Sequence, residues 1–259
     1  MALTALIFDV DGTLADTERD GHRIAFNAAF KEFGVDWEWS PELYGELLAV
    51  TGGKERMKHY VDFYNKNYQR PTDFDAQVAA MHKAKTRHYT QFLAAGGIPM
   101  RPGVKRLLDE VRAAGLRLAI ATTTTMDNVT ALLEHSLGPG SQQWFEVVGA
   151  GDVVPEKKPA PDIYLWVLDK LKVDAAECLA FEDSENGLRA SRGAGLATVI
   201  TTNDYTAAHD FRGALAVLSD FGEPGAPLRL ISGDAAGKAF VDVELLRYWH
   251  AQASVGEPV

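Results

Sequence analysis

Cysteine and long hydrophobic runs are the features that this sequence of 259 residues most clearly lacks. Cys178 is the only cysteine, so no disulfide can form within the chain, and we expect a reducing compartment, by default the cytoplasm. No apolar run approaches the roughly 20 residues that a membrane span needs, so we expect no membrane partner. The apolar stretch 5–8 runs directly into Asp9 and Asp11, which makes it too short and too charged for a signal sequence.

Positive charge is also scarce, because 26 Lys and Arg face 36 Asp and Glu and the formal net charge is −10. Nucleic acids and anionic membranes bind through clustered Lys and Arg, so we expect neither as the main partner. A small anionic substrate would need local positive charge or a metal ion. The hydrophobic fraction of 46% is ordinary for a globular protein, and the length suits a main body with an accessory module. We expect a monomer.

Strand-like and helix-like segments alternate along most of the chain. The strand-like runs are rich in β-branched residues, and between them lie helical stripes such as the apolar residues of 104–111. This alternation predicts an α/β fold, with a doubly wound, Rossmann-like parallel sheet that is covered by helices on both faces. The runs expected to form strands are 4–10, 116–122, 145–150, 178–183, 197–201 and, more weakly, 214–218.

The stretch between about residues 17 and 98 differs, because it has helix after helix and no convincing strand. Apolar residues recur at helical spacing from Phe26 to Phe33, and 77–93 carries a second long helical pattern. The simplest organisation is a helical cap domain, residues 17–98, inserted into a core domain made of residues 1–16 and 99–259.

Two linkers, near residues 14–16 and 98–102, would join such a cap to the core. A cap on two linkers can open to admit a substrate and close to exclude water. The segment after Ser219 carries no pattern that predicts a role, and the residues after Ala251 are expected to form a frayed tail.

Polar residues stand where several of the expected strands end. The first strand ends in Asp9-Val10-Asp11-Gly12-Thr13, and residues two apart in an extended chain point the same way, so both carboxylates face one spot. Open α/β sheets bind ligands at this carboxyl edge, and Gly12 lets the backbone turn there. The later groups are Thr122, Lys158 in Lys157-Lys158-Pro159, and Glu182-Asp183; all would meet at one site in a doubly wound sheet.

Phosphoryl transfer from a monoester needs a nucleophile, neutralisation of the phosphate charge and a proton donor for the leaving oxygen. A carboxylate cannot approach a phosphate dianion unaided, so we expect a hard cation, Mg²⁺, held by Asp9, Asp183 and Glu182. Lys158 can contact both the nucleophilic carboxylate and a phosphoryl oxygen. The remaining two groups, Thr122 and Asp11, can donate a hydrogen bond to another phosphoryl oxygen and shuttle the proton.

Each of these residues also has a plainer explanation when it is taken alone. Thr122 would fit the end of a β-branched strand, and Lys157-Lys158 a pair of solvated lysines. Glu182-Asp183 would fit the start of a helix, although Ser184 can take the capping role. The order of all the groups along the chain is what favours one site over several unrelated features.

The groups resemble the four motifs of the haloacid dehalogenase superfamily, here Asp9-Val-Asp11-Gly-Thr13, Thr122, Lys158-Pro159 and Glu182-Asp183-Ser184. The resemblance covers residues 4 to about 200, and the helical segment corresponds to the small cap of that superfamily. It implies a phosphatase in which Asp9 becomes phosphorylated. It also implies that Asp11 protonates the leaving group and then activates water, and that the backbone carbonyl of Asp11 binds the metal.

Substrate recognition is expected to come mostly from the cap. Gly52-Gly53-Lys54-Glu55-Arg56 stands out, because the paired glycines open a helix whose amino end and basic residues can hold a second phosphate. Solvated side chains are the alternative for each lysine. Trp37, Trp39 and Trp166 are expected to be packing residues. The candidates for contact with the substrate are Glu18, His22, Gly53, Lys54, Arg56, Lys83 and Lys85, with Thr123 on the core.

Within the superfamily the chain resembles the CbbY-type xylulose bisphosphate phosphatases of the Calvin cycle, through residues 8–18, 51–56 and 156–164. This resemblance implies hydrolysis of xylulose 1,5-bisphosphate to xylulose 5-phosphate. Beta-phosphoglucomutase is similar over the same length, and phosphoglycolate phosphatase is a third alternative. In the mutase pattern a Thr and a His lie four apart on one helical face; Thr17 and His22 lie five apart, which would turn His22 further around the helix.

A different class of protein has similar residues. Response-regulator receivers also place acidic residues, a Thr and a Lys on a parallel sheet, but they are much shorter and lack a helical insertion. A non-catalytic Mg²⁺-binding protein, or a signalling protein that accepts a phosphoryl group, is therefore the alternative to an enzyme.

Overall fold

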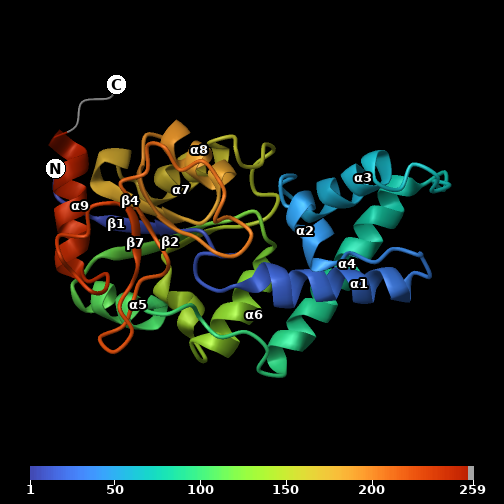
Figure 1. Ribbon diagram of the computed structural model, residues 1–259, viewed down its shortest axis with the longest axis horizontal. Coiled ribbons are helices and arrows are strands. Elements are labelled where there is room, and N and C mark those ends of the chain that lie inside the picture. The colour runs from blue at the N-terminus through green and yellow to red at the C-terminus, as the bar shows by residue number, and fades with distance from the viewer. Residues whose placement is uncertain (256–259) are drawn as a thin grey trace.

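Seven strands form one sheet in the larger body of the molecule, in a computed structural model that describes residues 1–255 (Figure 1). The strand order is β3-β2-β1-β4-β5-β6-β7, and every neighbouring pair is parallel except β6 and β7. The first strand therefore lies inside the sheet with later strands on both sides, which confirms the doubly wound fold. The strands are β1 (Ala5–Phe8), β2 (Arg117–Ala121), β3 (Val147–Gly149), β4 (Cys178–Glu182), β5 (Ala197–Thr201), β6 (Ala216–Leu218) and β7 (Leu230–Gly233).

Helices cover both faces of the sheet, because successive side chains of a strand point to opposite faces. In β1, Leu6 and Phe8 pack in one apolar cluster with residues of α5 (Val104–Ala113), α6 (Met126–Ser136) and α9 (Val243–Val255). Ala5 and Ile7 pack in a second cluster with α7 (Asp162–Leu171) and α8 (Glu185–Gly193). The apolar runs are thus strands that are buried on both faces.

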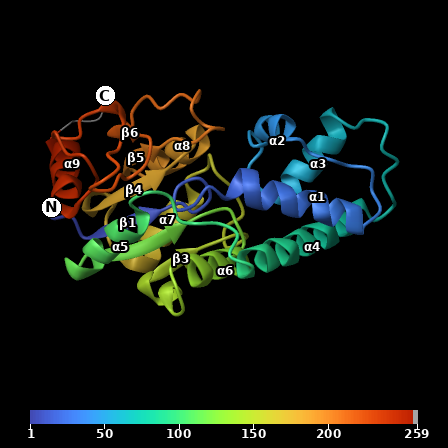
Figure 2. The ribbon, with the colours of Figure 1, turned by 60° about the horizontal axis from the view of Figure 1, so that its bottom comes forward.

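The helices between residues 18 and 94 stand to one side of the sheet, as Figures 1 and 2 both show. They share an aromatic cluster of their own, in which the ring centroids of Phe26 and Trp39 lie 4.8 Å apart. Trp37 and Trp39 are buried in it, as packing residues. We call residues 18–94 the cap; domain boundaries after residues 16 and 98 stay a prediction. The elements of the cap are a π-helical turn at Glu18–His22, α1 (Arg23–Glu32), α2 (Pro41–Leu47), α3 (Gly53–Phe63) and α4 (Phe74–Ala94).

The two linkers between cap and core run against each other. Ala15 and Met100 form an isolated antiparallel bridge, and the backbone N–H of Arg101 donates to the carbonyl of Leu14 at 2.9 Å. Both connections thus leave the core at one place, beside the loop that follows β1.

The C-terminal part of the described chain is more ordered than its sequence pattern predicted. β7 adds an antiparallel edge to the sheet, and α9 continues to Val255 instead of fraying after Ala251. The reason is burial, because Leu245, Leu246 and Trp249 pack into the core cluster beside α5. The part of the expected tail at 256–259 lies outside the described residues.

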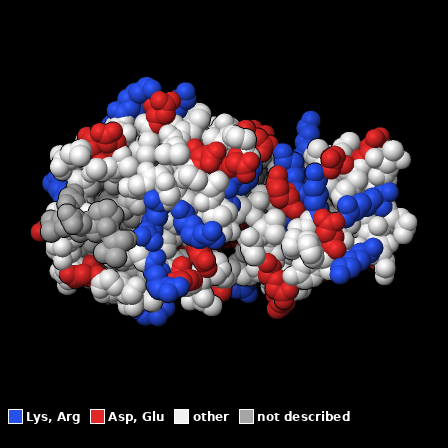
Figure 3. Space-filling view, turned by 90° about the horizontal axis from the view of Figure 1, so that it is seen from above, with Lys and Arg blue, Asp and Glu red and all other residues white. Residues whose placement is uncertain are grey.

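The distribution of surface charge and the character of the helices both bear on possible partners. Figure 3 shows acidic and basic side chains interspersed over the face that it displays, on core and cap alike. Among the described residues, no helix is both long enough and apolar enough to span a membrane.

Candidate active site

The residues singled out on the core meet in one cavity at the carboxyl edge of the sheet. β2 and β4 flank β1, so Asp9 after β1, Thr122 after β2 and the acidic pair at the end of β4 are neighbours. The cavity has a volume of about 220 Å³ and is bordered by both bodies of the molecule. Its lining includes Asp9, Asp11, Thr122, Thr123, Lys158, Glu182 and Asp183 from the core, and Glu18 and Arg56 from the cap.

Gly12 is required by the turn that presents the two aspartates. Its φ is +85°, a backbone angle that residues other than glycine rarely adopt. A Cβ atom at this position would also lie 2.2 Å from Oδ2 of Asp183. The turn and the acidic residue after β4 therefore touch only because residue 12 has no side chain.

Lys158 is the cation at the floor of the cavity, and its side chain is only 5% exposed. Its Nζ donates to Oδ1 of Asp9 at 2.7 Å, to Oε1 of Glu182 at 2.5 Å and to the carbonyl of Ala121 at 2.9 Å. Burial acts to lower the pKa of Lys158, but the carboxylates of Asp9 and Glu182 raise it above the ordinary value. Lys158 is therefore a fixed positive charge, and the neighbouring Lys157 does not share this position.

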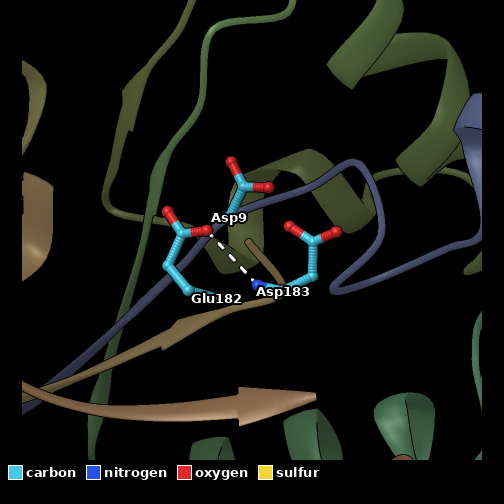
Figure 4. A group of neighbouring side chains, drawn as sticks. All are labelled: Asp9, Glu182 and Asp183. Atoms are coloured by element: carbon cyan, nitrogen blue, oxygen red, sulfur yellow. Dashed lines mark hydrogen bonds between the residues drawn. The ribbon is translucent and has the colours of Figure 1, made fainter. Parts of the chain in front are cut away.

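Asp9, Glu182 and Asp183 form a buried acidic cluster, each with a carboxylate oxygen within 4.8 Å of the others (Figure 4). Burial raises the pKa of Asp9 to about 7, even though Lys158 opposes the shift. Burial and the charges of Asp9 and Glu182 also raise the pKa of Asp183. Three carboxylates beside a single ammonium group leave an excess of negative charge, and the oxygen donors suit a divalent cation.

Two side chains that the sequence analysis did not select hold this cluster in place. The hydroxyl of Tyr164 donates to Oε1 of Glu182 at 2.5 Å, and Nδ2 of Asn203 donates to Oδ2 of Asp183 at 2.7 Å. The Tyr164 ring also lies 5.2 Å from the Nζ atom of Lys158. No spacing in the sequence pointed to either residue, because Tyr164 lies in a helix stripe and Asn203 in a loop.

Asp11 lies apart from this cluster and contacts the start of the cap. Its Oδ1 accepts a hydrogen bond from Oγ1 of Thr17 at 2.5 Å and lies 2.9 Å from Nε2 of His22. The other ring nitrogen of His22 lies 2.9 Å from Nζ of Lys85. Since a Lys ammonium can only donate, Nδ1 of His22 accepts, and Nε2 carries the proton that is donated to Asp11.

The contacts along this chain favour an ionised Asp11. Burial acts to raise the pKa of Asp11, but His22 and the hydrogen bonds from His22 and Thr17 lower it to about 2. Burial also lowers the pKa of Lys85 to about 8. Asp11, His22 and Lys85 thus form a line from the core into α4, which we call the cap relay.

The expectation that the five-residue spacing of Thr17 and His22 would turn His22 away was wrong. Thr17 directly precedes a π-helical turn, Glu18–His22, and His22 is the last residue of that turn. A π-helical turn is wider than an α-helical turn and accommodates one extra residue. Both side chains therefore reach Oδ1 of Asp11. The sequence contains no strong signal for such a turn, because a π-helix is set by packing as much as by composition.

The remaining cap candidates are distributed over several contacts. Arg56 is buried and donates to the carbonyls of Leu47 and Val50 and to the hydroxyl of Tyr44. That hydroxyl in turn donates to Glu18 at 2.5 Å.

The other three candidates on the cap differ in their position relative to the two cavities. Gly53 opens α3 and borders a small cavity that Asp11, His22, Arg56 and Lys85 also line. Lys54 pairs instead with Asp152 of the core, at 2.7 Å. Lys83 is exposed on α4 and lines neither cavity.

Fold and site together define a capped α/β protein whose buried acidic cluster suits a divalent cation. The family model of haloacid dehalogenase-like hydrolases matches residues 3–195. The chain therefore belongs to the haloacid dehalogenase-like hydrolase family, as its motifs predicted, and it is a phosphatase.

Relatives and solved structures agree with this assignment. "Protein CbbY, plasmid" of Cupriavidus necator is 48% identical over 248 residues, which cover 96% of this chain and 97% of the relative. A crystal structure of CbbY from Rhodobacter sphaeroides with phosphate is 44% identical, with a TM-score of 0.78 over 84% of this chain and 94% of that chain. Beta-phosphoglucomutase from Clostridium difficile, at 20% identity and a TM-score of 0.73 over 99% of this chain and 100% of that chain, shares the fold.

Proposed function

We propose that this phosphatase uses Mg²⁺ to hydrolyse a sugar bisphosphate, and that its substrate is xylulose 1,5-bisphosphate, which yields xylulose 5-phosphate. The observation that carries the proposal is Lys158, which is buried between Asp9 and Glu182 in a cavity that also borders the cap. A fixed cation beside a carboxylate lets that carboxylate approach a phosphate. The choice of sugar is supported by a mutant CbbY from Rhodobacter sphaeroides, 44% identical to this chain, whose crystal structure contains xylulose-(1,5)bisphosphate.

In the first step, an oxygen of Asp9 attacks phosphorus, and the bond between phosphorus and the sugar oxygen breaks. Lys158 and the hydroxyl of Thr122 stabilise the phosphoryl oxygens, since both are donors at the same edge of the cavity. The sugar oxygen takes its proton from Asp11. The products are phosphorylated Asp9 and a sugar monophosphate.

In the second step, water attacks phosphorus, the bond to Asp9 breaks, and Asp11 takes the proton of the water. Asp11 ends each cycle protonated, ready for the next leaving group. Without substrate, His22 and Thr17 hold Asp11 in its ionised form. A bound phosphate dianion favours the protonated form, because like charges disfavour ionisation.

The Mg²⁺ ion would be held by the carboxylates of Asp9 and Asp183 and by the backbone carbonyl of Asp11. Glu182 belongs to the same cluster, but its Oε1 already accepts from Lys158 and Tyr164, so we assign it mainly to positioning. The ion supplies the positive charge that the cluster lacks when a phosphate dianion enters.

The second phosphate of the sugar would be recognised from the cap. Lys85, Arg56 and the amino end of α3 at Gly53 border the small cavity next to Asp11. Backbone N–H groups at a helix start and cationic side chains both favour an anion. Lys54 lines neither cavity and is already neutralised by Asp152; we call this ion pair between cap and core the rim pair, or the rim.

One observation supports the alternative that the chain is a mutase. Since both Thr17 and His22 reach Asp11, their spacing no longer separates this chain from the mutase pattern. Glucose phosphates therefore belong in the substrate test, together with phosphoglycolate.

The experiment is phosphate release with Mg²⁺ from xylulose bisphosphate, ribulose bisphosphate, glucose phosphates and phosphoglycolate, with Asp9→Asn as the control. We expect the highest kcat/KM for xylulose bisphosphate and a loss of at least about 10³-fold in the control. Preference for another sugar would overturn the substrate and leave the mechanism. Phosphate release that does not depend on Asp9 would overturn the mechanism itself.

We further propose that the enzyme acts as a monomer in the cytoplasm. All the side chains assigned above come from one chain, and its single cysteine, Cys178, is buried. Light scattering of the purified protein tests the first statement, and a stable dimer would contradict it.

A further inference from the structure

Arg101 is a buried arginine that binds backbone carbonyls from three separate segments of the core. Its residue is 7% exposed. Nη1 donates to the carbonyl of Gly12 and, at 3.2 Å, to both the carbonyl and the hydroxyl oxygen of Thr201. Nη2 donates to the carbonyl of Thr202 at 2.5 Å and to that of Ser219 at 2.7 Å. The guanidinium therefore ties together the loop after β1, the end of β5 and the end of β6.

The same residue belongs to the second linker between core and cap. Its backbone N–H donates to the carbonyl of Leu14 in the first linker, at 2.9 Å. Its Nε lies 3.3 Å from Oδ1 of Asp16, also in the first linker. Any motion of the cap on its linkers therefore acts on a residue whose side chain is fixed in the core.

The carbonyls that Arg101 binds lead directly to the proposed metal ligands. Gly12 follows Asp11, whose backbone carbonyl we assign to the metal. Thr202 precedes Asn203, whose Nδ2 donates to Oδ2 of Asp183 at 2.7 Å. On one side, the guanidinium thus binds the residue that directly follows the proposed ligand Asp11. On the other side, it binds the residue before Asn203, which holds the proposed ligand Asp183 by a hydrogen bond.

We propose that Arg101 is a positioning residue for the reaction. It fixes the loop after β1, which carries the proposed ligand Asp11, and the loop after β5, whose Asn203 holds the proposed ligand Asp183, so that the two ligands stay in register while the cap moves. The proposal rests on the function proposed above. It requires an arginine, because five donors in a planar fork can serve carbonyls in several directions, whereas a lysine offers three donors on one atom. Arg101 lines neither the active-site cavity nor the small cavity next to Asp11, and its effect passes through Gly12 and Asn203.

Arg106 provides a matched control, five residues further along the chain. It also donates to backbone carbonyls, those of Gly222 and Val241 at 2.9 Å each, and it pairs with Glu223. These partners belong to the C-terminal part of the core and border neither cavity. If Arg101 had only a structural role as a binder of carbonyls, substitution of Arg101 and substitution of Arg106 should therefore have equal effects on metal binding.

The test compares Arg101→Lys and Arg106→Lys in the full chain. Mn²⁺ binding, measured by electron paramagnetic resonance without substrate, should weaken at least about tenfold in Arg101→Lys and less than twofold in Arg106→Lys. With Mg²⁺ and the preferred substrate, kcat should fall more than tenfold in Arg101→Lys with KM within threefold. Thermal unfolding, recorded for both variants, shows whether each protein is folded at the assay temperature.

Equal effects of the two variants on metal binding, or unchanged binding in a folded Arg101→Lys, would overturn the proposal. Should Arg101→Lys not fold, Thr201→Val removes one acceptor of the guanidinium and keeps the branched shape; metal binding should then weaken about threefold, and unchanged binding would also overturn the proposal. Failure of the proposed function would appear separately, as a wild-type protein that binds Mn²⁺ but releases no phosphate.

Discussion

The core and the cap both contribute to one site, but they position their residues in different ways. On the core, Asp9, Thr122 and Asp183 stand at or just beyond strand ends, and neighbouring strands bring them together. On the cap, the contacts depend on which way a helix faces, and a single extra residue in the π-helical turn decides whether His22 reaches Asp11. The place of a side chain at a strand end is thus set by the sheet, whereas one extra residue in a helix changes the direction in which its side chains face.

The two regions also differ in how strongly charges hold them. Lys158 is buried against the carboxylates of Asp9 and Glu182, where the local dielectric is low and each interaction is strong. The contacts between cap and core include an exposed pair, Lys54 with Asp152, and such pairs contribute little. We therefore expect substitutions to have graded effects: large in the core cluster, intermediate in the cap relay and small at the rim.

The largest effect is expected for Lys158→Met, compared with Lys157→Met. Loss of Lys158 removes the cation that Asp9 and Glu182 share, and kcat should fall about 10³-fold, which corresponds to about 4 kcal/mol. The Nζ atom of Lys157 contacts the exposed carboxylate of Asp152 instead, so its variant should keep kcat within about twofold. Steady-state kinetics on the preferred substrate measure both.

This pair of variants also tests the choice between two adjacent lysines. If Lys157→Met were the more damaging, the assignment of the catalytic lysine would be reversed. If neither variant mattered, buried charge in the core would not explain the activity.

An intermediate effect is expected for His22→Gln, because His22 donates to Asp11 and accepts from Lys85. Gln can keep one of these two contacts, so we expect kcat to fall about 10- to 100-fold, within the range for impaired general acid–base catalysis. The matched control is His88→Gln, since His88 of α4 pairs with the exposed Glu32 at 2.8 Å. It should change kcat by less than about twofold.

Quenched-flow measurement of phosphorylated Asp9 would locate the defect. Slower breakdown of that intermediate in His22→Gln would support a relay that acts on Asp11. A normal kcat in this variant would remove the cap relay from the mechanism and leave it a structural contact.

Much of the core could be predicted from the sequence, for a physical reason. β-branched apolar runs give parallel strands, and their carboxyl ends must share an edge, so the sequence alone could bring Asp9, Thr122 and Asp183 together. Tyr164 and Asn203 could not, because each reaches the acidic cluster from a helix or loop by a tertiary contact. Nothing in the local sequence records such a contact.

The cap was harder to predict because helix geometry and packing decide its contacts. Regular helical spacing placed His22 off the face of Thr17, and only the π-helical turn restores the alignment. Arg56 was proposed as a phosphate ligand from its place near a helix start, yet it also binds Tyr44 and two carbonyls within the cap. The C-terminal β7 and α9 carried too weak a pattern to be expected.

The smallest effect is expected at the rim, where Lys54 of α3 and Asp152 of the core form an ion pair across the two bodies. Its residues are exposed, 36% and 65% by side chain, so Lys54→Met should change the free energy of unfolding by less than about 0.5 kcal/mol. Because the pair links cap to core, the variant should instead raise KM about two- to fivefold and make KM less sensitive to added salt.

The matched control for this rim pair is Lys58→Met. Lys58 and Asp75 form an equally short pair of 2.7 Å, but both residues lie in the cap, so cap closure does not change their separation. Titration of KM between low and high ionic strength should therefore distinguish Lys54→Met from Lys58→Met. Identical salt dependence of the two variants would mean that the exposed pair across the two bodies contributes nothing to closure, and that cap and core are held together by the buried contacts alone.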